Sequence, residues 1–197
     1  MSKKTQPNTL YAISPIETIL AQLDTASKIP ATEKTLDHCG EMFRSLWMAK
    51  EVLDGYRTVQ PRYTPKAVSG GCFYAAALAR NLFGGDLHGN WQHVWIENKN
   101  VRIDLTGLAD VSLEQATRVH LAMLRRQRCT VKKLPDGQFT VQRHTIDGWY
   151  QQPNVDPATF FVHDKTAITS PDATITLAKT ISHALLWGDL IRQYLIS

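Results

Sequence analysis

The chain has 197 residues, of which 22 are lysine or arginine and 18 are aspartate or glutamate, giving a formal net charge of +4. Hydrophobic residues make up 43% and charged residues 20%, which excludes a disordered or fibrous protein and is typical of a globular one. No apolar run approaches the roughly 18 residues of a membrane span, and the polar N-terminus has no signal-peptide core. We expect a cytoplasmic protein, with secretion as an effector by a signal-independent route left open.

The first predicted elements are a flexible tail and two helices. Residues 1–12 are expected to form the tail, and residues 13–197 a single α+β domain. A capping box at residues 14–17 has proline at its first helical position and predicts a helix start. Apolar residues at helical spacing predict a second helix over residues 35–53, which Gly55 ends.

The middle and the C-terminal parts of the chain combine helical and strand signals. After a proline-containing loop at 56–69, two glycines precede an alanine-rich helix that ends at Gly84. Alternating apolar residues, a second capping box and a Pro-Asp-Gly turn define the elements beyond it. In chain order we predict a helix at 73–83, strands at 92–97 and 101–106, a helix at 112–128, strands at 129–134 and 138–143, an irregular stretch at 144–169 and a helix from residue 170.

The three cysteines, Cys39, Cys72 and Cys129, are widely spaced, and no C-x-x-C pair occurs. An odd number without that motif argues against a disulfide framework or a zinc ribbon. Cys39 lies on the apolar stripe of its helix and Cys129 begins a strand, so both are expected to pack as small hydrophobic residues. Cys72 is therefore the candidate reactive thiol.

Cys72 stands where Gly70 and Gly71 end and a helix begins. A thiol is a nucleophile only when it is ionised, and a helix N-terminus favours the thiolate through its backbone N–H groups and dipole. Glycines beside the sulfur leave room for a substrate to approach it. The alternative is a small residue packed at a tight turn.

The strands at 92–97 and 101–106 place a histidine near an aspartate. A turn at Asn98-Lys99 gives facing residues a constant index sum of 197, which pairs His93 with Asp104 and Trp95 with Arg102. Directly opposed Cβ atoms are about 5 Å apart, within reach of a hydrogen bond. Asp104 is then expected to orient the His93 ring and stabilise its cation, and a Trp95–Arg102 cation–π contact is expected beside it.

Taken together, these residues form a pattern that resembles that of a known enzyme family. Gly71-Cys72 at a helix start, then H-x-W-x-E at residues 93–97 and D-x-T at residues 104–106, resembles the transglutaminase-like branch of the papain-like cysteine enzymes. The resemblance covers roughly residues 69–107. It implies a papain-like core, with the nucleophile helix packed on a small antiparallel sheet and helices flanking it. It also implies Cys72 as nucleophile, His93 as general base and Asp104 as the orienting acid.

Cys72 and His93 are 93 − 72 = 21 residues apart, which leaves little room for another strand between them. The side chain that completes the oxyanion hole in such enzymes is not identified by the pattern. Gln60, Tyr63 and Gln92 are candidates by residue type alone. His38, His120 and His183 lie in predicted helices and are expected to be structural or exposed.

The chemistry expected of this constellation is acyl transfer at an amide bond of a protein or peptide, through a thioester. Water as acceptor gives a protease, amidase or deamidase, and an amine as acceptor gives a transglutaminase. No metal or nucleotide cofactor is required for these steps. The sequence leaves the substrate, the acceptor and the oligomeric state open.

The sequence leaves two alternative functions open. One is a zinc site with the ligands Cys72, Asp86, His88 and His93, although their spacing matches no established metal motif. The other is a non-enzymatic binding module. Between residues 118 and 143, seven basic residues face one acid, a net charge of 7 − 1 = +6 that suits nucleic acid or another anionic surface. A solvated basic surface is the more common meaning of such a cluster, so a nucleic-acid partner is not the main expectation.

Overall fold

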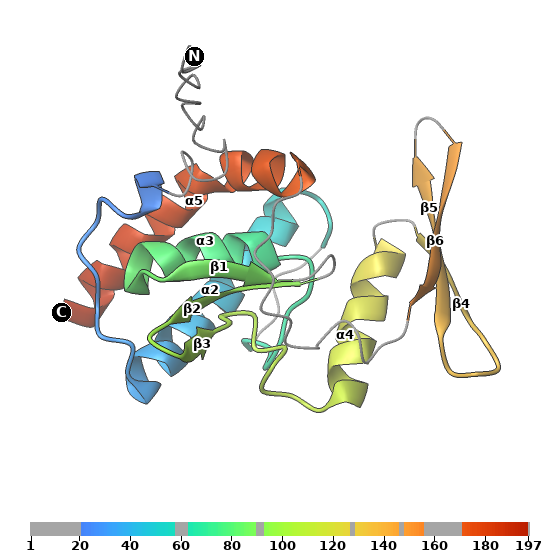
Figure 1. Ribbon diagram of the computed structural model, residues 1–197, viewed down its shortest axis with the longest axis horizontal. Helices are drawn as coiled ribbons and strands as arrows, with labels where there is room; N and C mark the ends of the chain where they lie inside the picture. Colours follow the sequence, from blue (N-terminus) through green and yellow to red (C-terminus); the bar gives the residue numbers. More distant parts are fainter. Residues whose placement is uncertain are drawn as a thin grey trace, which may run out of the picture.

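The computed structural model describes residues 21–57, 63–89, 93–126, 129–145, 148–155 and 171–196. The protein is mixed α+β, and helices cover a small three-stranded antiparallel sheet. A second three-stranded sheet stands apart from this main body, beside one helix (Figure 1). The expected tail at residues 1–12 and the capping box at 14–17 lie outside the described residues.

Three helices build the main body. α2 spans Glu33–Leu53 and begins with a capping box in which Thr32 and Thr35 exchange hydrogen bonds. α3 spans Cys72–Phe83, and its C-cap Gly84 has a φ of +74°. α5 spans Pro171–Ile196 and packs along α3, opposite the sheet (Figure 1). The predictions of these three helices are confirmed, because capping and glycine signals mark their ends in the sequence.

The central sheet has the order β1-β2-β3, with β1 at Asp86–Gly89, β2 at Val94–Asn98 and β3 at Val101–Ile103. β1 was not predicted, and it occupies the interval between α3 and β2 that seemed too short for a strand. Four residues suffice because Gly84 and Gly85, both at positive φ, turn the chain directly from α3 into β1.

The register of the β2–β3 hairpin differs from the prediction by two residues. Ile96 pairs with Ile103 and Asn98 with Val101, so the index sum is 199 and the predicted direct pairing of His93 with Asp104 is wrong. The turn is Lys99-Asn100, both at positive φ as a type I′ turn requires. Asn98 stays in the strand, since its side-chain amide donates to the Phe83 carbonyl at the end of α3 (2.6 Å).

The outlying part of the protein consists of α4 and the second sheet. Ser112 caps α4 by accepting a hydrogen bond from the Gln115 N–H at 3.2 Å, as its capping box predicts. The prediction of an irregular stretch at 144–169 is wrong at residues 144–145, where the second strand of the hairpin continues, and over residues 148–155, where a third strand pairs with it. The bounds are Leu113–Arg126 for α4, Cys129–Lys133 for β4, Phe139–Thr145 for β5 and Gly148–Val155 for β6.

The main core lies between α3, the central sheet, α2 and α5. Its largest fully buried side chains include Phe43, Leu78, Leu82 and Ile96. Cys39 belongs to this core with no exposed surface, and Cys129 packs against Met123 and Leu124 of α4, so both predictions of packing cysteines are confirmed. None of the helices in the described ranges combines the length and the apolar composition of a membrane span.

Candidate active site

Cys72 is the first residue of α3 and is half-buried. The turn before it is held by close packing, because a Cβ on Gly71 would lie 2.9 Å from the Trp47 ring, which leaves room only for glycine. Gly71 is the N-cap and has no side chain to occupy the first backbone N–H groups of α3. The Ala75 N–H donates a hydrogen bond to the Gly71 carbonyl, at 2.8 Å.

His93 and Asp104 form a buried ion pair even though they are not directly opposed. A shift of two residues keeps both side chains on the same face of the sheet, where they are diagonal neighbours. His93 Nε2 lies 2.8 Å from Asp104 Oδ2, and the two side chains are only 5% and 3% exposed. Asp104 Oδ1 accepts two hydrogen bonds from Thr106, from its backbone N–H at 3.1 Å and its hydroxyl at 2.6 Å.

Cys72 lies close enough to His93 to contribute to the raised pKa of that ring. Since Nε2 of that ring faces Asp104, Nδ1 is the ring nitrogen left for the sulfur. The three predicted site residues therefore lie together in the order Cys72–His93–Asp104, with His93 between the thiol and the carboxylate. Thr106 holds the Asp104 carboxylate through its two hydrogen bonds.

The electrostatics of the pair favour its charged form. Burial by itself lowers the pKa of His93, but the charge and hydrogen bond of Asp104, together with Cys72, outweigh it and raise that pKa to about 10. Burial by itself raises the pKa of Asp104, but the charge and hydrogen bond of His93, with help from Thr106 and Arg102, lower it to about 2. Both groups are therefore ionised at neutral pH.

Arg102 and Trp95 cover this pair. The Arg102 guanidinium lies 4.5 Å from the centre of the Trp95 ring, so the predicted cation–π contact is present, although Arg102 is paired with Glu97 rather than with Trp95. Trp95 also stacks on His93, with ring centroids 6.2 Å apart. The stack excludes water from the ion pair and holds the His93 ring plane.

His120 of α4 is a site residue that the sequence prediction missed. Its Nδ1 lies 3.0 Å from the hydroxyl of Ser69, three residues before the nucleophile. Burial, and after it the charge of His93, lowers the pKa of His120 to about 4. One signal was present in the sequence: His120 shares the inward face of its helix with Ala116 and Met123, at a spacing of four and then three.

The other predicted candidates contribute little within the described residues. Gln60 and Gln92 lie outside them, and Tyr63 is 78% exposed. No group of three His, Cys, Asp or Glu side chains in the described part of the chain is placed to hold a metal ion. His88 instead faces Glu97 at 3.9 Å.

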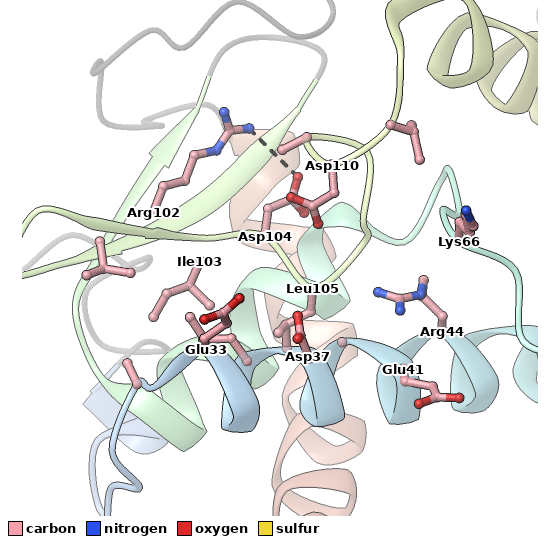
Figure 2. Close-up of a pocket in the computed structure, with 16 residues that line it drawn as sticks. Glu33, Asp37, Glu41, Arg44, Lys66, Arg102, Ile103, Asp104, Leu105 and Asp110 are labelled. Atoms are coloured by element: carbon pink, nitrogen blue, oxygen red, sulfur yellow. Dashed lines mark ion pairs between the residues drawn. The ribbon is translucent and has the colours of Figure 1, made fainter.

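A groove of about 910 Å³ lies between α2 and the chain from Val101 to Val111 (Figure 2). Of the three candidate catalytic residues, only Asp104 lines this groove, and neither Cys72 nor His93 does. Glu33, Asp37 and Glu41 follow one another along α2 at its edge, and Asp110 faces them across the groove (Figure 2). We therefore do not assign the groove to the reacting bond.

A smaller hollow of about 230 Å³ lies nearer to the nucleophile in sequence. It is bounded by Ser69, by Val119 of α4 and by the ion pair of Glu51 with Arg57. The Glu51 side chain is 6% exposed and the Arg57 side chain 26%. This hollow opens beside the turn that carries Cys72, on the side where His120 binds Ser69.

The two histidines are expected to titrate on opposite sides of neutrality. In a ¹⁵N-detected NMR titration, His120 should take up its proton only near pH 4, and His93 should lose its proton only near pH 10. Both ordinarily titrate near 6.5. A His120→Asn variant assigns the first signal by removing it. Both rings titrating between pH 6 and 7 would contradict the described burial and pairing.

The same shifts predict how folding stability depends on pH. The contribution of His93 is complete below pH 6.5 and is lost as the pH rises through about 10, because the folded state holds the proton more tightly. The contribution of Asp104 is complete above pH 3.8 and is lost as the pH falls through about 2. His120 acts in the opposite sense to His93: the fold loses stability as the pH falls from 6.5 to about 4, because the unfolded chain takes up the proton first. Urea unfolding of wild type and His120→Asn over this range isolates its share.

Comparison with family models, with curated proteins and with solved structures finds no match to this chain.

Proposed function

We propose that this chain is a cysteine enzyme that transfers the acyl group of an amide bond through a thioester. The observation that carries the proposal is the almost fully buried His93–Asp104 ion pair beside the thiol of Cys72, at the start of α3. The packing of α3 against the central antiparallel sheet supports a papain-like core, as the resemblance of the motifs implies.

In this mechanism the Cys72 sulfur attacks the carbonyl carbon of a protein or peptide amide. The developing oxyanion is bound by backbone N–H groups at the start of α3, which Gly71 leaves accessible. The charged His93 ring gives its proton to the leaving amine and so becomes neutral, and Asp104 holds the ring in place throughout. A thioester on Cys72 remains.

His93 then acts as the general base for the second half of the reaction. It removes a proton from water or from an incoming amine, which attacks the thioester and restores the Cys72 sulfur. Water completes hydrolysis or deamidation, and an amine completes transamidation. The two outcomes are separable by measuring ammonia release against the incorporation of a fluorescent primary amine into a glutamine-containing protein.

Selective alkylation tests the nucleophile before a substrate is known. With iodoacetamide at pH 6–7, Cys72 should be modified at least about tenfold faster than Cys39 or Cys129, as mapped by peptide mass spectrometry. Exposure alone also favours Cys72, so the matched control is His93→Asn, which keeps Cys72 at the same helix start. Cys72 should react markedly more slowly in that variant. Equal rates in wild type and His93→Asn would remove the basis of the proposal.

The alternative function, a module that binds nucleic acid or another anionic surface, has one observation in its favour. Arg118, Arg125, Lys132 and Lys133 are exposed on α4 and β4, on the outlying part of the molecule. A steep fall of nucleic-acid affinity with salt would favour it. It gives no account of a buried His–Asp pair beside a thiol, and we therefore rank it second.

A further inference from the structure

The turn that presents Cys72 is held from three sides. On one side the Val68 N–H donates to the Thr106 carbonyl at 2.9 Å, which ties the turn to the residue that anchors Asp104. On the second side Gly71 packs on Trp47 of α2. On the third side a Cβ on Gly70, which has a φ of +86°, would lie 3.2 Å from the Met123 side chain of α4.

The face of α4 that meets this turn is apolar except at one position. Ala116 packs against Ala67, and Met123 packs against Gly70. His120 lies between them and bonds Ser69, which is itself 5% exposed. An apolar side chain would fill this interface without the cost of burying an imidazole, so the polar contact needs a reason beyond packing.

The position of His120 near the catalytic histidine restricts its charge. His93 is cationic at neutral pH, and a second cation close to it in a buried site would be repelled. The pKa of His120, lowered to about 4, satisfies this condition and leaves a neutral ring that bonds Ser69 without opposing the charge on His93.

We propose that His120 is a positioning residue: by its hydrogen bond to Ser69, α4 holds residues 69–71 in the conformation that presents Cys72 to His93. This inference rests on the proposed function, because it assigns His120 a role in placing the nucleophile. It makes α4, which also carries the outlying sheet, part of the catalytic unit. His120 itself does not touch the reacting atoms.

The test uses the rate of Cys72 alkylation by iodoacetamide together with thermal unfolding. His120→Leu and Ser69→Ala each remove the hydrogen bond, and each should lower the Cys72 rate about tenfold. The double variant should be no slower than either single one, since both remove the same contact. His120→Asn places an amide where Nδ1 lies, and should keep the rate within about twofold of wild type. His38→Asn, on α2, is the control for a histidine away from the turn.

The melting temperatures of these variants distinguish a positioning role of His120 from a role in packing alone. Each single variant leaves a buried polar group without its partner, whereas the double variant replaces both by apolar groups and should recover the melting temperature of the wild type. If the double variant recovers stability and alkylation stays slow, the positioning role is supported. If alkylation recovers with stability, if Ser69→Ala reacts like wild type, or if His120→Asn is as slow as His120→Leu, the role is refuted. Slow, unselective alkylation of Cys72 in the wild type would instead refute the proposed function, and this inference with it.

Discussion

Replacing Cys72 by alanine should abolish acyl transfer and leave the fold intact. Loss of the nucleophile of a catalytic triad removes the covalent route altogether, so we expect at least about a 10³-fold fall in the rate of acylation. Alanine is well tolerated at the start of a helix, and the half-buried thiol is little larger than a methyl group. The free energy of unfolding should therefore fall by no more than about 1 kcal/mol.

Acylation can be measured with an activated ester, p-nitrophenyl acetate, by rapid acid quenching and mass spectrometry of the intact chain. The wild type should gain one acetyl group, mapped to Cys72, and the Cys72→Ala variant should gain none on this timescale. Cys129→Ala is the matched control, because it removes a thiol of the same size from the packing between α4 and β4. Undiminished acylation of Cys72→Ala would exclude this thiol as the nucleophile. A collapse of its thermal stability would show that the residue is there for packing.

Local sequence signals accounted for the helices of the main body and for the residue types of the site. The ends of α2 and α3 follow from a capping threonine and from glycine, which act within a few residues along the chain. The residues that we propose as catalytic were chosen in the same way, because a cysteine at a helix start and a His–Asp pair on one strand face are local patterns. The face was predicted correctly even though the register was not, since any even shift preserves it.

What the sequence did not predict depends on contacts between distant segments. The Asn98 amide meets the carbonyl of Phe83, fifteen residues earlier, and this contact moves the turn to Lys99-Asn100. His120 meets Ser69 across 51 residues, so its place on the inward face of α4 indicates burial but does not identify its partner. β1 was missed because four residues are too few for an alternating pattern to stand out.

The geometry around Asp104 makes a strong prediction for Asp104→Asn. Thr106 donates two hydrogen bonds to Oδ1, so the carbonyl oxygen of an asparagine should take that position and its amide group should face His93. An amide N–H directed at Nε2 forces that nitrogen to accept, which places the ring proton on Nδ1, facing the sulfur. The ring then has no lone pair toward Cys72 and no carboxylate to support its cation.

We therefore expect Asp104→Asn to slow acylation by about 10³- to 10⁴-fold, the cost of a wrong tautomer in a triad. Its unfolding free energy should fall by on the order of 3 kcal/mol, because the variant breaks a buried ion pair from one side. Arg102→Ala is the control: its guanidinium lies 3.7 Å from the same carboxylate but is partly exposed, and its loss should cost less than about tenfold in rate. The ¹⁵N shifts of His93 report the tautomer directly, so a slow variant whose Nε2 still carries the proton would disprove this explanation. A variant that acylates within tenfold of wild type would remove Asp104 from the catalytic unit.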